Sequence, residues 1–192
     1  SDFLVRLLAR RPRLLDWLGT PGRLERERDA PSLRAELALR TARLDPEDLP
    51  GLMRVLRRFR AREILRIAAR DLAGAAPLPA IVRELSSLAE ACLAAAVPFI
   101  DALLRRRHGA PEGAPAPGDG FCVLGMGKLG GRELNFSSDI DLLLVYARDG
   151  RTAGGAQGAV THFEHYARLA ELLTRALGEV TEDGFVFRVD LN

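Results

Sequence analysis

Residues 125–142 read GMGKLGGRELNFSSDIDL, and this stretch decides the fold. It begins where a short apolar run, residues 121–124, ends, and it leads into a second apolar run over residues 140–146. We expect both runs to be strands, the second without polar alternation and therefore buried on both faces. Between them, Gly130 and Gly131 are expected to open a short helix. Glycine lets the backbone approach a phosphate, and the free N–H groups of a helix start face an anion.

Asp139 and Asp141 lie two residues apart at the start of the second strand. Side chains two apart on a strand point to the same face, so both carboxylates face one way while Ile140 enters the core. Two adjacent hard oxygen ligands suit Mg²⁺, with Mn²⁺ as the alternative ion. A third carboxylate usually completes a two-metal site, and Asp190 on a later strand is the candidate. The motif is not a Walker loop, since Lys128 precedes the glycine pair.

The chain divides into three regions by composition. Residues 1–108 show helical spacing of apolar side chains, residues 109–119 consist of Gly, Ala, Pro and acidic residues, and residues 120–192 alternate strand and helix patterns. We interpret them as a helical N-terminal region, a linker or mobile loop, and an α/β catalytic core with helices packed on a sheet. In that core a helix over 160–177 precedes a third strand over 185–191. The chain stops inside this strand, which we interpret as a truncated end.

The helical region carries three further expectations. Residues 45–48, Asp-Pro-Glu-Asp, combine a capping Asp, a first-turn Pro and acidic residues, so a helix is expected to start there. Residues 78–107 are expected to form a long helix with a kink or break at Pro98. Trp17 is expected to lie in the core.

Composition places the chain among soluble globular proteins. Hydrophobic residues make up 47% and charged residues 28% of the chain, and the formal net charge is +2. So small a charge gives no sign of a nucleic-acid partner. The start of the chain lacks a long apolar run, so we expect no signal peptide, no membrane partner and a cytoplasmic location. Cys92 and Cys122 lie in apolar stretches and are expected to be buried free thiols.

Other polar residues carry weaker predictions. His162 and His165 lie three apart on a predicted helix, a spacing that can chelate a metal. No third ligand is apparent, so surface positions are expected for both.

The arginine-rich face over residues 54–70 is open to two interpretations. It is either a solvated face with Glu63 and Asp71 as local partners, or a surface for an anionic substrate, further domains or a protein partner.

The order of glycine pair, short helix, Asp-X-Asp and apolar strand resembles the signature of the nucleotidyltransferase superfamily. More closely, residues 125–142 resemble the bifunctional glutamine synthetase adenylyltransferase/adenylyl-removing family, whose members carry two copies of this domain. Ser-Ser-Asp-Ile-Asp at residues 137–141 is similar to the N-terminal copy, which removes AMP. The helical stretch LRRFRAREILRI at residues 56–67 and FRVDL at residues 187–191 resemble the same region. Asn192 stands where the family continues with an arginine.

This resemblance implies a mixed sheet flanked by helices and a Mg²⁺-dependent enzyme. The implied reaction is phosphorolysis, in which inorganic phosphate attacks AMP carried by a tyrosine of glutamine synthetase and gives ADP. Glutamine synthetase, AMP or ADP, and phosphate are the implied partners, with a PII signal protein as regulator. The implied phosphate binders and metal ligands are Gly130, Gly131, Ser138, Lys128, Arg132, Asp139, Asp141 and Asp190. A solvent-facing role stays open for Lys128 and Arg132.

Two other functions stay open from the sequence. One keeps the superfamily but uses ATP as donor and transfers AMP to a protein, an RNA or a small molecule. The other is a non-catalytic docking or regulatory fragment. The intact trio of carboxylates argues against the second, since a purely structural domain has no need of clustered negative charges.

Overall fold

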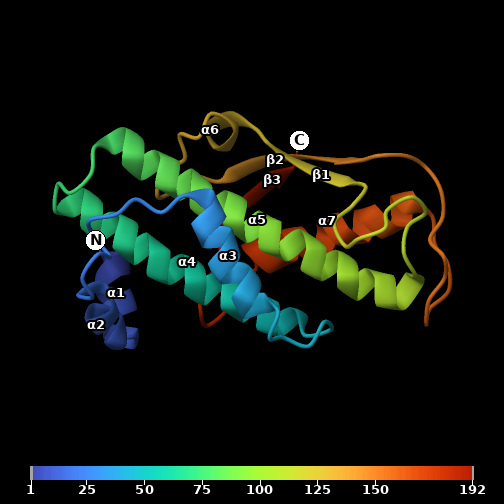
Figure 1. The fold of residues 1–192 in the computed structure, drawn as a ribbon, viewed down its shortest axis with the longest axis horizontal. Helices are drawn as coiled ribbons and strands as arrows, with labels where there is room; N and C mark the ends of the chain where they lie inside the picture. The colour runs from blue at the N-terminus through green and yellow to red at the C-terminus, as the bar shows by residue number, and fades with distance from the viewer. Residues whose placement is uncertain (1, 192) are drawn as a thin grey trace.

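The computed structural model describes residues 2–191, in which helices lead into a small sheet (Figure 1). The elements follow in the order α1 (Asp2–Arg10), α2 (Arg13–Leu18), α3 (Ala30–Thr41), α4 (Leu49–Leu72), α5 (Leu78–His108), β1 (Phe121–Gly125), α6 (Gly127–Gly130), β2 (Ile140–Tyr146), α7 (His162–Gly178) and β3 (Val189–Leu191). The expected α/β class is confirmed, with a helical part first and a mixed sheet after it.

A capping residue sets where α4 begins. Asp48 precedes α4, and its carboxylate accepts from a backbone N–H of the first turn at 2.8 Å. The expected start at residues 45–48 is therefore too early, because Asp45 instead accepts from the N–H of Glu47 in a separate turn. α5 continues through Pro98 as one helix, so a break there is wrong, while the alternative of a kink stays a prediction.

One hydrophobic core extends from α3 through α5 to the sheet and α7. Its buried side chains form a single contiguous cluster that includes Leu33, Leu56, Leu88, Ile140 and Leu173. By length and hydropathy alone α5 meets the criterion for a membrane span, but most of its apolar stretch is buried in this core. Cys92 lies here as expected, and burial raises the pKa of its thiol to about 12.

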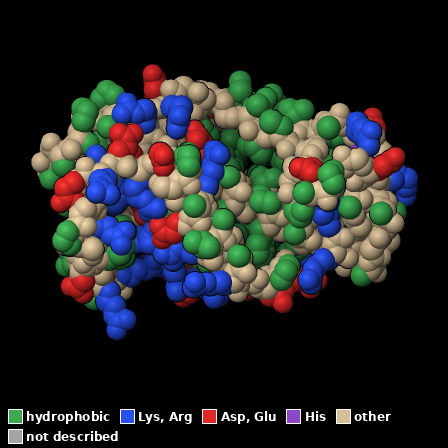
Figure 2. All heavy atoms as spheres, viewed as in Figure 1, with side chains coloured by type: hydrophobic (Ala, Val, Ile, Leu, Met, Phe, Trp, Pro, Cys, Tyr) green, Lys and Arg blue, Asp and Glu red, His purple; other side chains and the backbone are tan. Residues whose placement is uncertain are grey.

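Trp17 does not belong to this core, so its predicted burial is wrong. The ring is partly exposed and lies against two guanidinium groups, those of Arg23 and Arg62, each 4.7 Å from the ring centroid. Cation–π contact of this kind holds the partly exposed ring against the arginine side chains. Figure 2 shows basic side chains gathered over this helical end of the molecule, around α1, α2 and α4.

Buried ion pairs join α4 to α5 and to the segment before α3. Arg66 pairs with Glu63 at 2.9 Å and with Glu84 at 2.6 Å, and all three side chains are buried. Arg70 approaches Glu84 at 3.2 Å, and Arg28 approaches Glu63 at 2.8 Å. Charges taken out of water need such close partners, because a lone buried charge is strongly unfavourable.

Arg57 ties α4 to the end of α7. Its buried guanidinium donates to the backbone carbonyls of Met53, Ala176, Glu179 and Gly184. A cation at a helix C-terminus complements the exposed carbonyl dipoles, and the contact with residue 184 holds the segment that leads to β3. A solvated face over residues 54–70 is thus wrong for Arg57, Arg66 and Arg70, although Glu63 is a local partner as expected.

A buried polar cluster fastens residues 109–119 to the helices. Asp101 of α5 lies 2.6 Å from Nε2 of His165 on α7 and accepts from Nε of Arg105 at 2.7 Å. Asp101 and Arg105 also bind backbone groups of the 109–119 segment, at 2.7 to 2.8 Å. The expected surface positions of His162 and His165 are wrong: both rings are buried, because α7 packs this face against the rest of the fold.

Asp101 is expected to make the fold sensitive to acid. Burial works to raise the pKa of its carboxyl, but hydrogen bonds from His165, Gly118 and Arg105 hold that pKa below its ordinary value of 3.8. Its contribution to stability is therefore present above the unfolded pKa of about 3.9, and it is lost as pH falls through the lower folded pKa.

Urea unfolding between about pH 5 and pH 2 measures this contribution. Asp101→Asn is expected to lose less stability over that interval than the wild type, because the amide does not titrate. Glu171→Gln, an exposed change on α7, is the control and should keep the wild-type dependence. A wild-type dependence in Asp101→Asn would show that this carboxyl has no depressed pKa.

The strands form one sheet in the order β1-β2-β3. β1 runs antiparallel to β2, while β2 runs parallel to β3 and places Asp141 opposite Asp190. The strand expected over residues 185–191 is confirmed only for β3 itself. The reason is that the N–H groups of Val186 and Phe187 both donate to a carbonyl at the end of α7, at 2.8 and 3.2 Å.

The outer face of the sheet is open in the described part of the chain. Leu143 and Val145 are 37% and 43% exposed, whereas Leu142 is fully buried on the inner face. The expectation that β2 is covered on both faces is therefore wrong here. Cys122 and Leu124 of β1 share the exposed face, so the expected burial of Cys122 is also wrong.

Candidate active site

The three candidate carboxylates lie at one end of the sheet, two on adjacent strands and the third just before β2. Asp141 on β2 and Asp190 on β3 are direct partners across the parallel strands. Asp139 immediately precedes β2, whose first residue, Ile140, is fully buried as expected. Strand alternation sends Ile140 into the core and the two carboxylates that flank it to the opposite face. Two neighbouring strands thus contribute acidic groups to the same face.

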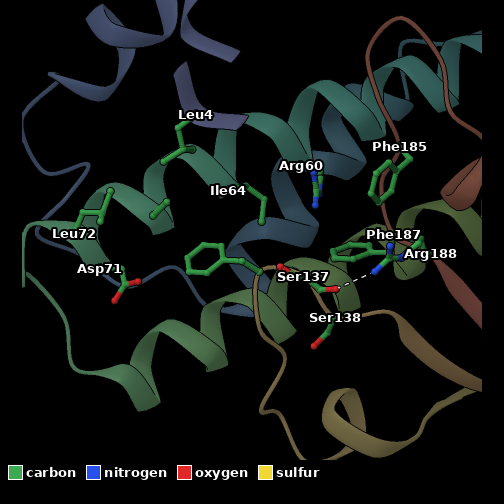
Figure 3. Close-up of a pocket in the computed structure, with 12 residues that line it drawn as sticks. Leu4, Arg60, Ile64, Asp71, Leu72, Ser137, Ser138, Phe185, Phe187 and Arg188 are labelled. Carbon is green, nitrogen blue, oxygen red and sulfur yellow. Dashed lines mark hydrogen bonds between the residues drawn. The ribbon is translucent and has the colours of Figure 1, made fainter. Parts of the chain in front are cut away.

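Arg188 is a residue of this site that the sequence analysis missed. Its guanidinium forms an ion pair with Asp139. It also donates to the carbonyl of Ser137 at 3.2 Å (Figure 3). Its own carbonyl accepts from the N–H of Ile140 at 2.9 Å, which extends the strand pairing to this position. A signal was available, because Arg188 lies two residues before Asp190 and so shares its face of an extended strand.

The carboxylate end of the sheet has the donor chemistry of a divalent-metal site. Carboxylate oxygens are the ligands that Mg²⁺ and Mn²⁺ prefer, and Asp141 and Asp190 present them on neighbouring strands. Across residues 2–191, no three potential ligand side chains are arranged to hold a metal ion as they lie. Because Arg188 holds Asp139, this arginine must release the carboxylate before all three can act together. The metal assignment stays a prediction.

The glycine-rich loop lies close to the acidic end of the sheet. α6 is a single turn above β2 in Figure 1, and the N–H of Met126 donates to the carbonyl of Asp141 at 2.8 Å. Gly127 has a φ of 51°, and a Cβ there would lie 2.9 Å from a carboxylate oxygen of Asp141. Glycine is the residue that adopts this left-handed backbone without a penalty. Gly127 is therefore a second site residue that the sequence analysis missed.

Gly130 and Gly131 end α6 rather than begin a helix. Their N–H groups donate to the carbonyls of Met126 and Gly127, each at 3.0 Å. The prediction that this pair opens a helix with free N–H groups is wrong, because the single turn already starts after Met126. Phosphate binding by the pair stays a prediction, and it would have to use groups other than these two N–H donors.

The two glycines are expected to differ in their tolerance of a side chain. A Cβ at Gly130 would lie 2.5 Å from the carbonyl oxygen of Gly125, whereas at Gly131 the nearest atom would be 3.5 Å away. Gly130→Ala is therefore expected to lower the free energy of unfolding in urea by about 1–3 kcal/mol. Gly131→Ala is the matched control and should stay within about 0.5 kcal/mol of the wild type. Equal losses in both variants would refute the close approach at Gly130.

The other predicted anion binders lie in different places. Ser138 adjoins Asp139, and its hydroxyl donates to the side-chain oxygen of Asn135 at 2.8 Å within a tight turn. Lys128 is exposed on α6. Arg132 binds two side chains of α5, at 3.1 and 3.4 Å, which hold its guanidinium on that helix. The structure thus places Ser138 beside the carboxylates and ties Arg132 to α5.

Comparison with known proteins identifies the family to which this arrangement belongs. The whole chain, residues 1–192, matches the family described as glutamate-ammonia ligase adenylyltransferase. The chain belongs to this family. The resemblance predicted from the motif at residues 125–142 is therefore confirmed, and members of the glutamate-ammonia ligase adenylyltransferase family are nucleotidyl-transferring enzymes by name.

Curated relatives in this family are named bifunctional glutamine synthetase adenylyltransferase/adenylyl-removing enzyme. The chain is 44% identical to the protein of Thioalkalivibrio sulfidiphilus over 193 residues, 45% identical to that of Nitrosococcus oceani over 192, and 41% identical to that of Pseudomonas aeruginosa over 192. Each alignment covers all of this chain and 19% or 20% of the relative. The chain thus spans about a fifth of the length of these adenylyltransferase relatives.

Proposed function

We propose that this chain carries out the AMP-removing reaction on glutamine synthetase, by phosphorolysis of the bond between AMP and a tyrosine. The observation that supports this most is the pairing of Asp141 with Asp190 across β2 and β3, beside Asp139. Such a carboxylate set suits the transfer of a phosphoryl-type group. The names of the relatives add that an adenylyl-removing activity exists in longer members of the family.

The proposed reaction exchanges one phosphorus–oxygen bond for another. An oxygen of inorganic phosphate bonds to the AMP phosphorus, and the bond from that phosphorus to the tyrosine oxygen breaks. The products are ADP and a phenolate, which takes a proton from water. This chemistry depends on positioning and charge neutralisation more than on covalent help from the protein. Mg²⁺, or Mn²⁺, held by Asp139, Asp141 and Asp190 would supply that charge neutralisation.

Other residues of the chain would position the phosphate groups. Arg188, once turned from Asp139, would place a cation against the AMP phosphate. The Ser138 hydroxyl next to Asp139 would offer a hydrogen-bond donor. Gly127 keeps α6, and with it Lys128, close to Asp141. These roles follow from where the side chains lie and extend the proposal to residues outside the carboxylate trio.

Adenylylated glutamine synthetase is the protein partner in this proposal, and phosphate, AMP and ADP are its small ligands. A PII signal protein as regulator and a cytoplasmic location are further parts of it. They rest on the family resemblance and on composition.

An assay with adenylylated glutamine synthetase tests the function. The chain, phosphate and Mg²⁺ are expected to form ADP and unmodified glutamine synthetase, and omission of phosphate or addition of EDTA should stop ADP formation. Consumption of ATP with unmodified glutamine synthetase, in place of ADP formation, would favour the adenylylating reaction. Neither reaction from the folded protein would favour a docking fragment.

A further inference from the structure

A cavity of 510 Å³ opens beside the carboxylate end of the sheet. It lies between α4, the turn that carries Ser137 and Ser138, and the segment leading to β3 (Figure 3). Its volume falls within the range of about 300–1,000 Å³ that small-molecule sites occupy. Apart from Ser138 and Arg188, the lining residues have no role in the proposed phosphate chemistry, so they require a separate explanation.

The cavity is lined mainly by aromatic and aliphatic side chains. Three phenylalanines, Phe136, Phe185 and Phe187, contribute to the wall. The guanidinium of Arg60 lies 5.4 Å from the ring centroid of Phe185 and 5.7 Å from that of Phe187. Figure 3 shows Ile64 and Arg60 projecting from α4 toward Phe187. Aromatic faces together with a guanidinium plane are what proteins use to stack a nucleobase, because every base has a π-face.

The cavity adjoins the candidate active site through Ser138 and Arg188. Ser138, in its wall, is the residue before Asp139. Arg188, also in its wall, forms an ion pair with Asp139 and donates to the carbonyl of Ser137 at 3.2 Å. A ligand that enters the cavity with its apolar end can thus direct its other end past Arg188 to the carboxylates.

We propose that this cavity binds the purine base of the adenylate, while the phosphate of the same nucleotide lies at the carboxylate end. A purine has two apolar faces and a polar edge. The cavity offers aromatic and aliphatic walls, and its polar lining residues are Arg60, Asp71, Ser137, Ser138 and Arg188. A bare phosphate would gain nothing from the phenylalanine rings. The inference rests on the proposed function for the identity of the base, but its test is independent of catalysis.

Binding of adenosine to the metal-free, 192-residue chain is the test, by calorimetry and by saturation-transfer NMR. Adenosine has the base but no phosphate, so it reports on the cavity alone. Phe185→Ala is expected to weaken adenosine binding by about tenfold, the size of a lost base–aromatic stack. Ala68→Met, which extends a side chain into the cavity from α4, should also weaken it. Phe163→Ala, on an exposed ring of α7, is the matched control and should bind as the wild type.

Two results would overturn the inference. One is the absence of adenosine binding to folded wild-type protein. The second is equal adenosine affinity in wild type, Phe185→Ala and Ala68→Met. Adenosine binding without phosphorolysis would support the cavity and count against the proposed function. Phosphorolysis without adenosine binding would support the proposed function and count against the cavity as the site of the base.

Discussion

Asp141→Asn is expected to abolish ADP formation while the protein stays folded. Asp141 is the partner of Asp190 across β2 and β3, so an amide removes a hard oxygen ligand from the pair and keeps the size of the side chain. Loss of charge neutralisation at the transferred group should slow phosphorolysis by about 10³-fold or more. The circular dichroism spectrum and the midpoint of thermal unfolding should match the wild type, because this side chain is only partly buried.

Asp149→Asn is the matched control for that change. Asp149 is exposed in the loop after β2, where it accepts from the hydroxyl of Tyr146 at 2.8 Å. The same chemical change there should leave ADP formation within about twofold of the wild type, because the group lies at the far end of β2 from the carboxylates. Mg²⁺-dependent turnover at the wild-type rate in Asp141→Asn would remove Asp141 from the active site.

Glu84→Gln is expected to be the most destabilising conservative change in the helical part. Glu84 is fully buried, pairs with Arg66 at 2.6 Å and Arg70 at 3.2 Å, and accepts from the N–H of Arg28 at 2.8 Å. The neutral amide leaves two buried guanidinium groups short of a counter-charge. A loss of about 3–5 kcal/mol in the free energy of unfolding is expected, which urea denaturation measures directly.

Glu27→Gln is the control for this prediction. Glu27 pairs with Arg83 at 3.3 Å, but both side chains are well exposed, so the pair contributes little in water. A change of no more than about 0.5 kcal/mol is expected. If Glu84→Gln were as mild as Glu27→Gln, the arginines of α4 would not depend on Glu84 for their burial.

Local patterns were sufficient to predict β1, β2 and α7. β2 (Ile140–Tyr146) has the bounds expected from its apolar run, and β1 (Phe121–Gly125) extends the expected strand by one residue. α7 begins at His162 because Thr161 and Glu164 form a capping box, close to the predicted start at residue 160. In each case the signal lies within a few neighbouring residues, which is the range over which sequence patterns are reliable.

Contacts between distant parts of the chain could not be predicted in this way. Arg57 binds the carbonyl of Gly184, 127 residues away, and Arg188 binds Asp139, 49 residues away. From the sequence alone, a buried arginine of α4 resembles an exposed one such as Arg58, because the partner that decides its burial is on another element. The prediction for the glycine-rich loop was wrong for a related reason. The backbone conformation at Gly127 depends on its close approach to Asp141, which lies on the following strand.

Phosphorolysis is the central claim, and the fate of labelled phosphate tests it most directly. Adenylylated glutamine synthetase is incubated with this chain, Mg²⁺ and ³²P-labelled inorganic phosphate, and the nucleotides are separated. If phosphate attacks the AMP phosphorus, the label appears in ADP, in its terminal phosphate, in step with the loss of AMP from glutamine synthetase. Release of unlabelled AMP instead would show that water is the nucleophile and would contradict the account.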